Sequence, residues 1–183
     1  MPAQIIKRRA RFFIAVEGES EQSFVRWLQN LSQNELHIHL DCFPLGGGGF
    51  KSMLEKTVRL QKRHSRAGPY KACFLIMDRD RAEQGDWSIE RLRREAAKHK
   101  INICVQKPNH EGLLLRMMPG MEQESPDASS AENRLKSRWA TYQKPVNAQT
   151  LARKFSLDDL LRVAQLDPDL RSLLKKIGLM GGG

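Results

Sequence analysis

The sequence predicts an α/β fold, with a mostly parallel sheet flanked by helices and a small helical extension at the C-terminal end. Two short, uninterrupted apolar runs, 12–16 and 73–77, are typical of strands buried on both faces of a parallel sheet. Segments that alternate between strand and helix patterns indicate a layered α/β architecture with right-handed crossovers. The 183 residues are enough for one sizeable core and hardly for two.

The first strand is expected at 12–16, and Phe24, Leu28 and Leu31 recur along one face of the helix that follows. The second strand is expected at 36–43. Polar and apolar residues alternate along it, so one of its faces is polar and the strand is expected at an edge of the sheet. The rest of the domain is expected as helix 51–66, strand 72–77, helix 88–100, strand 101–105 and a short helix that reaches Leu115.

The composition changes after Pro119, where a stretch rich in Pro, Ser and acidic residues indicates a loop. Beyond it, Leu135, Trp139 and Tyr142 have helical spacing, 156–159 resembles a capping box, and the Pro after Asp167 opens a last helix. We therefore expect an α/β domain at 1–118, a loop or linker at 119–131, and a helical extension at 132–180 that packs on the same domain.

The formal net charge of +10 and the pI near 9.9 favour a polyanionic partner, of which nucleic acid is the first candidate. A basic surface that is merely solvated is the alternative. The three cysteines, Cys42, Cys73 and Cys104, have no metal or disulfide spacing, which is typical of thiols in a reducing cytoplasm. The pattern contains no signal peptide and no membrane span, because Glu17 interrupts the first apolar run.

Carboxylates follow both buried strands. Glu17 comes after the first, and Asp78 and Asp80 come at the end of the third, where a spacing of two points both side chains the same way. Parallel sheets bind ligands at the carboxyl ends of their strands, and clustered carboxylates repel one another unless a cation such as Mg²⁺ lies between them. The alternative is that each acid caps the next helix or turn.

This pair of motifs resembles the Toprim domain, a Rossmann-like fold of topoisomerases, primases and nucleases. The run from Val16 to Glu21, followed by Phe24 and Leu28, is most similar to the small RloB-like and OLD-family Toprim proteins of bacterial defence loci, and the similarity covers about 11–118. The resemblance implies that Glu17, Asp78 and Asp80 are catalytic and bind Mg²⁺ or Mn²⁺.

Two further acids are candidate metal ligands. Glu21 lies in the first turn of the first helix, where an acid also complements the helix dipole, so a metal role and a capping role both stay open. The segment from Pro108 to Glu111 is similar to an acidic motif of RloB-like proteins, but Gly112 stands where bulkier residues are common. Glu111 is therefore a candidate ligand, and His110 has a catalytic and a capping interpretation.

A run of four glycines, Gly46–Gly49, precedes Lys51, but Phe50 breaks the P-loop spacing. The run is either a flexible turn or an anion-binding loop beside Lys51. The helix that follows carries a basic stripe with helical spacing, which is either a solvated face or a phosphate track. We include it among the candidate nucleic-acid-binding residues, which are Lys51, Arg59, Lys62, Arg63 and Arg66.

The sequence therefore predicts a Mg²⁺-dependent nuclease of bacterial defence or nucleic-acid processing. The alternative is a catalytically quiet Toprim-like subunit that binds nucleic acid or a protein partner in a defence complex. The resemblance leaves open a partner ATPase that is encoded separately, and the sequence does not determine the oligomeric state. No zinc pattern, serine nucleophile motif or dinucleotide fingerprint competes with this prediction.

Overall fold

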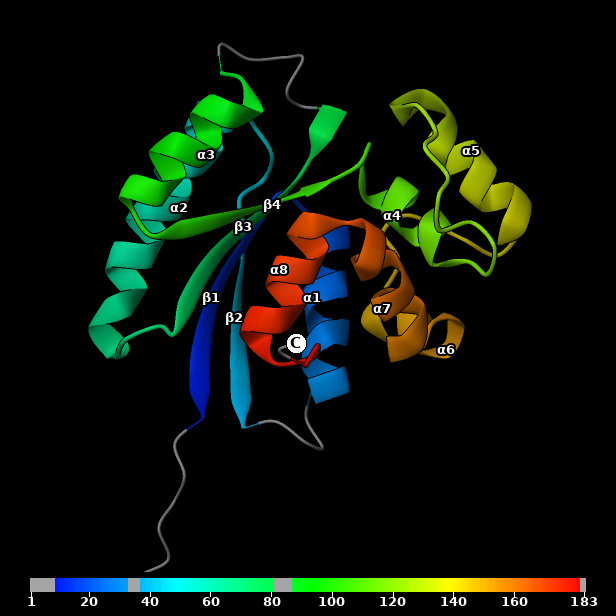
Figure 1. The fold of residues 1–183 in the computed structure, drawn as a ribbon. Helices are drawn as coiled ribbons and strands as arrows, with labels where there is room; N and C mark the ends of the chain where they lie inside the picture. Colours follow the sequence, from blue (N-terminus) through cyan, green and yellow to red (C-terminus); the bar gives the residue numbers. More distant parts are fainter. Residues whose placement is uncertain (1–8, 33–36, 81–86, 182–183) are drawn as a thin grey trace, which may run out of the picture.

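The computed structural model describes residues 9–32, 37–80 and 87–181, and within them four strands form one parallel sheet between two layers of helices (Figure 1). The strand order is β2-β1-β3-β4, and every neighbouring pair is parallel. The strands are β1 (Ala10–Val16), β2 (Ile38–Pro44), β3 (Ala72–Asp78) and β4 (Ile101–Gln106). The predicted α/β class is confirmed, and β2 lies at an edge, as its alternating pattern predicted.

Alternation along the strands divides the core into two clusters. Phe12, Ile14 and Val16 of β1 face one cluster, and Phe13 and Ala15 face the other. All five side chains are buried, because helices cover both faces of the sheet. This explains why the sequence of β1 reads as a continuous apolar run.

The helices are divided unequally between the two faces (Figure 1). One face is covered by α2 (Phe50–His64), which continues into the 3-10 turn η1 (Ser65–Ala67), and by α3 (Ile89–Lys98). The other is covered by α1 (Glu19–Ser32), α4 (His110–Met117) and α8 (Pro168–Ile177). Around α4 and α1 pack α5 (Ala128–Arg138), α6 (Ala148–Lys154) and α7 (Leu157–Leu166). None of the described helices combines the length and the apolar character that crossing a bilayer requires.

The predicted boundaries in the C-terminal extension need correction. Helix α5 begins at Ala128, inside the predicted loop at 119–131, because the side chain of Asp127 accepts a hydrogen bond from the Ser130 backbone N–H and caps the helix. The helix ends at Arg138, so Trp139 and Tyr142 do not lie on it as predicted. Instead, the Trp139 ring packs edge-on against Phe155, 5.7 Å away. Helix α6 was not predicted.

The last two helices begin where the sequence predicts. Ser156 and Asp159 form the predicted capping box of α7, and Pro168 occupies the first turn of α8. Gly178 ends α8 in the left-handed conformation, with φ at 87°. The apolar residues of α7 and α8 belong to the same core cluster as α1 and one face of the sheet.

Candidate functional site

The sheet has a switch point between its two central strands. The helix after β1 covers one face, whereas the helix after β3 covers the opposite face. The two connections therefore diverge at the carboxyl ends of β1 and β3, and they leave a crevice of the kind in which open α/β sheets bind ligands. Val16 pairs with Ile76 across the two strands, so Glu17 and Asp78 both reach this crevice.

Glu17 and Asp78 are in direct contact. The Glu17 Oε2 atom accepts a hydrogen bond from the Asp78 backbone N–H at 3.3 Å, and the Glu17 residue is 7 % exposed. The metal-site interpretation requires β3 to lie beside β1, and it does. The bond links the end of one central strand to the end of the other.

Asp78 has the most perturbed carboxyl group in the crevice. Burial and the negative charges of Glu21, Glu17, Asp80 and Glu111 raise the pKa of Asp78 from 3.8 to about 9. Its Oδ1 atom is buried and has no hydrogen-bond partner among the described residues. A buried carboxylate oxygen without a donor, surrounded by like charges, is expected where a cation or a proton belongs.

Glu21 takes the capping role, which is one of the two that the sequence left open, and it also lines the acidic crevice. Its Oε2 atom accepts a hydrogen bond from the Gly18 backbone N–H at 3.0 Å, so it does satisfy the start of α1. It is also buried and contributes to the raised pKa of Asp78. Glu21 therefore caps α1 and adds negative charge to the crevice.

The candidate acids are divided between two neighbouring cavities. A cavity of about 300 Å³ is lined by Glu17, Glu21 and Asp78. Asp80 instead lines a cavity of about 790 Å³ together with Lys107. The separation follows from the turn after β3, in which the backbone N–H groups of Arg79 and Asp80 both donate to the Pro108 carbonyl. The spacing-based expectation that both aspartates point into one site is therefore met only in part.

A lysine that sequence reasoning missed enters the acidic cavity. Lys144 is one of the residues that line this cavity, and its Nζ atom lies 2.7 Å from Oε1 of Glu111. The same Glu111 oxygen accepts a hydrogen bond from the Tyr142 hydroxyl at 3.0 Å. Burial alone would raise the pKa of Glu111, but the hydrogen bond and charge of Lys144 outweigh it and lower that pKa. No local motif pointed to Lys144, because its segment has no pattern of its own.

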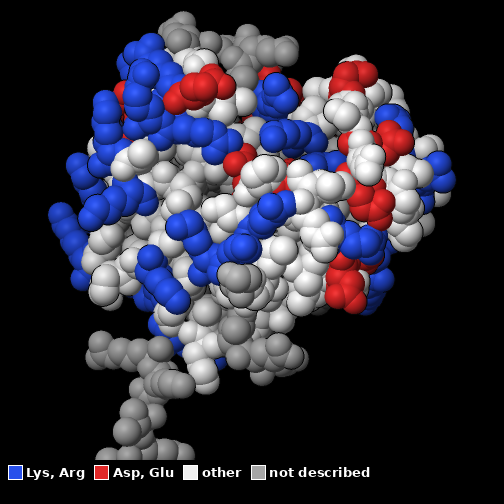
Figure 2. Space-filling view, viewed as in Figure 1, with Lys and Arg blue, Asp and Glu red and all other residues white. Residues whose placement is uncertain are grey.

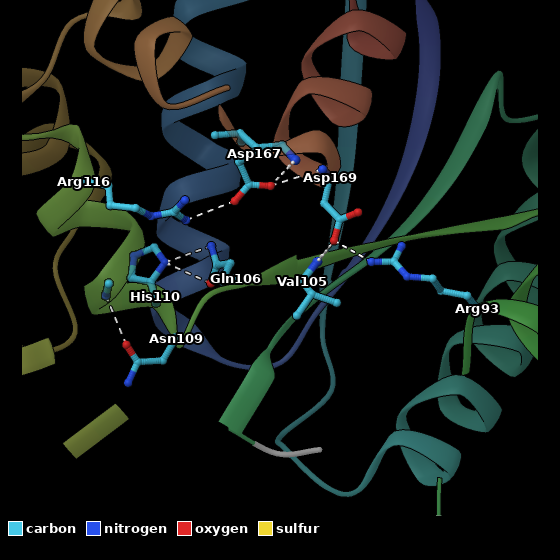
Figure 3. A network of polar contacts seen from close by, with 10 residues as sticks. Arg93, Val105, Gln106, Asn109, His110, Arg116, Asp167 and Asp169 are labelled. Atoms are coloured by element: carbon cyan, nitrogen blue, oxygen red, sulfur yellow. Dashed lines mark hydrogen bonds and ion pairs between the residues drawn. The ribbon is translucent and has the colours of Figure 1, made fainter. Parts of the chain in front are cut away.

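His110 is held in the core beside this site (Figure 3). It is fully buried, its Nδ1 atom lies 3.2 Å from the side-chain amide of Gln106, and its Nε2 atom has no partner among the described residues. Burial lowers its pKa against the opposing effect of Glu21 and Glu111. His110 is therefore not the capping residue of the second interpretation. Asn109 caps α4 instead, because its side chain accepts a hydrogen bond from the Gly112 backbone N–H.

The tight start of α4 explains a departure from the RloB-like motif. A Cβ atom at Gly112 would lie 2.4 Å from Cδ of Pro108 and 2.9 Å from the Lys107 carbonyl oxygen. Neither neighbour is the flexible end of a side chain, so only glycine fits. Glu111, the residue before Gly112, is buried and contacts Lys144 of the acidic cavity.

The glycine run lies at the same edge of the sheet. The backbone N–H of Gly47 donates to the Glu17 carbonyl, and Gly46, Gly47 and Gly48 all have positive φ. Lys56 donates to the carbonyls of Leu45 and Gly47 at 3.0 Å, which ties the loop down. Lys51 is exposed in the first turn of α2, 4.0 Å from Glu55.

The chemistry of the crevice fits a hard divalent cation, whereas the present side-chain positions do not close around one. The negative charges of four carboxylates act on Asp78, whose Oδ1 atom has no partner among the described residues, and oxygen-only donor sets suit Mg²⁺ and Mn²⁺. Within 9–32, 37–80 and 87–181, however, no three His, Cys, Asp or Glu side chains are close enough together to hold an ion. Side-chain rotations would be needed to bring Glu17, Glu21 and Asp78 onto one.

Lys144→Met is expected to lower the stability of the folded chain in EDTA by about 1–3 kcal/mol, because buried Glu111 loses a charged hydrogen-bond partner. The same change should increase the thermal stabilisation by Mn²⁺, since the ammonium group no longer competes for the carboxylates. Melting curves over a Mn²⁺ titration measure both effects. Lys176→Met, on the exposed end of α8, is the control, and a smaller Mn²⁺ response in Lys144→Met would contradict the competition.

Comparison of the chain with protein-family models, with curated proteins and with solved structures found no match. The resemblance to Toprim proteins therefore stays a prediction from the motifs. What the site can do has to be argued from its own residues.

Proposed function

We propose that this chain is a Mg²⁺- or Mn²⁺-dependent phosphodiesterase that cleaves nucleic acid at the crevice between β1 and β3. The observation that carries the proposal is the buried Asp78 Oδ1 atom without a donor, at the switch point of the sheet, among the charges of four other carboxylates. Perturbed acids in a crevice are typical of functional sites. The Toprim resemblance supplies the reaction class, and the basic composition supplies the substrate class.

Glu17, Asp78 and Glu21 would hold the metal, with Asp80 and Glu111 at its margins. A divalent cation bound there would lower the pKa of a water molecule and neutralise charge on a phosphate. Glu17 is oriented for this by its bond to the Asp78 N–H, and Glu21 by its bond to the Gly18 N–H. Such bonds keep the carboxylates in place while they repel one another, as preorganised sites require.

A catalytically quiet binding subunit is the second candidate. Lys144 already supplies a positive charge at Glu111, and the acids as they stand do not close around an ion. A protein that keeps its acids neutralised by a lysine and a proton needs no metal. This candidate retains nucleic-acid binding and has no turnover.

Single- and double-stranded DNA and RNA, each incubated with the chain in Mg²⁺, Mn²⁺ or EDTA, provide the test. Metal-dependent cleavage that disappears in Asp78→Asn supports the proposal. Binding without cleavage in every combination, unchanged in Asp78→Asn, identifies the quiet subunit. The chain is assayed alone, so that any cleavage is its own.

A further inference from the structure

The basic charge of the chain is concentrated on the layer that α2 and α3 form. Eleven basic and three acidic residues lie in these helices and at Arg66 and Lys100 just beyond them. Their net charge, eleven minus three, is +8, compared with a formal +10 for the whole chain. Lys and Arg side chains accordingly gather over α2 and α3 in Figure 2.

The cations on α2 are available to a ligand. Arg59, Lys62, Arg63 and Arg66 are all exposed, and none of them forms an ion pair with another described residue. A surface that only needed to be solvated would gain from alternating charges, which pair along a helix. Over the last two turns of α2, this stripe has no acidic partners in the part of the chain that the structure describes.

The cations on α3 belong to the same surface, except for one. Arg91, Arg94 and Lys98 are exposed, and the last two share Glu95 as a partner. Arg93, by contrast, donates to Asp169 at 2.7 Å and so has a structural role between α3 and α8 (Figure 3).

A groove runs between the two helices. It has a volume of about 410 Å³, and its lining includes Val58 and Arg59 of α2, Trp87 before α3, and one acid from each helix, Glu55 and Glu95. The guanidinium group of Arg91 lies over the Trp87 ring, 4.8 Å from its centre. Aromatic side chains beside exposed cations are typical of surfaces that bind nucleic acid, in which the backbone contacts the cations and not the acids.

The first turns of α2 and α3 lie at the same edge of the sheet as the acidic crevice. Both helices begin at the carboxyl edge of the sheet and end at the opposite edge, since each crosses back between parallel strands. Lys51 therefore lies near Glu17, whereas Arg66 and Lys100 lie at the far edge. At 1.5 Å per residue, α2 is about 22 Å long. This is the length of about six phosphates on one strand of a duplex.

We propose that the α2/α3 layer is the surface that holds the nucleic acid, with the backbone running along the exposed cations of the two helices, from Lys51 toward Arg66 and Lys100. The layer adds Arg91, Arg94 and Lys98 to the contacts expected from α2 alone. The inference rests on the proposed function for its choice of ligand, but it does not depend on cleavage.

The experiment measures the affinity of a labelled DNA duplex of about 20 base pairs between about 50 and 200 mM salt, in EDTA to prevent cleavage. Replacing Arg91, Arg94 and Lys98 together with Gln should flatten the slope of log K against log salt by up to about 2.7, because each lost phosphate contact removes about 0.9. The matched control is the Gln triple variant at Arg153, Lys175 and Lys176, which are exposed on α6 and α8. Its slope should equal that of the wild type.

Equal flattening in the two triple variants, or an unchanged slope in the α3 variant, overturns the inference. Binding of a polyglutamate peptide as tight as that of the duplex also overturns it, because the surface would then recognise acidic protein. A flattened slope in a chain that never cleaves supports the inference while the proposed function fails. Cleavage that depends on Asp78, with no effect of the α3 variant on the slope, supports the function while the inference fails.

Discussion

Asp78→Asn is expected to abolish metal-dependent cleavage and, in EDTA, to make the folded chain more stable than the wild type as the pH rises. The first effect follows from the loss of the carboxylate on which the charges of the other acids act. The cleavage rate is expected to decrease by more than about a hundredfold, because even the groups that only support metal ligands contribute 10–100-fold to metal affinity or activity. The second effect arises because the wild type must either keep a buried negative charge on Asp78 or bind a proton there, whereas an asparagine is neutral.

The pH dependence has a definite sign. The pKa of Asp78 is raised from 3.8 in the unfolded chain to about 9 in the folded one, so folding takes up a proton between these values. The resulting stability is fully present below pH 3.8 and is lost as the pH rises toward 9. The loss is at most about 1.4 kcal/mol per pH unit, and neighbouring acids that titrate with Asp78 share it. An asparagine does not titrate, so the stability of Asp78→Asn does not decrease in this way as the pH rises.

Chemical denaturation of both proteins at several pH values in EDTA measures the difference, and melting with added Mg²⁺ measures the metal response. The wild type should gain stability from Mg²⁺, and Asp78→Asn should not. Asp158→Asn, which removes an exposed acid on α7, should leave the cleavage and the metal response unchanged. A stability difference that does not grow with pH, together with an intact Mg²⁺ response, would assign Asp78 a structural role.

Asp167→Ala is expected to lower the free energy of unfolding by about 4–6 kcal/mol. Asp167 is 3 % exposed, its Oδ2 atom accepts a hydrogen bond from Arg116 at 3.0 Å, and its Oδ1 atom accepts from the backbone N–H groups of Asp169 and Leu170 (Figure 3). Breaking a buried ion pair costs about 3–5 kcal/mol, because the remaining charge stays in the core, and a lost cap adds about 1. Arg116 lies on α4, so the bond joins the extension to the helix of the crevice.

Urea unfolding measures this loss, and Asp127→Ala is the matched control. Asp127 caps α5 in the same way but is exposed and forms no ion pair with another described residue, so its removal should cost only about 1 kcal/mol. Both variants should unfold in a single transition, since the extension and α1 share one core cluster. Two transitions, of which Asp167→Ala shifts only the first, would show that the extension unfolds independently.

Most of the sheet could be predicted because each strand carries its own pattern. The apolar run of β1 and that of β3 each specify a buried strand without reference to the rest of the chain, and β2 specifies an edge strand by its alternation. Helix ends were predictable where a capping residue marks them, as Ser156 does for α7. The end of α5 was not, because Trp139 leaves the helix to pack on Phe155, which is a contact distant in sequence.

By itself, the sequence determined the class of fold and the edge at which the acids of the site gather, because the carboxyl ends of parallel strands lie on one side. It also determined the basic stripe of α2, which follows from helical spacing alone. The tertiary structure decided that β3 lies beside β1, which brings Asp78 to Glu17, and that the turn after β3 directs Asp80 into a separate cavity. It alone placed Lys144 at Glu111, since long-range packing against α4, and no local pattern, brings that segment to the crevice.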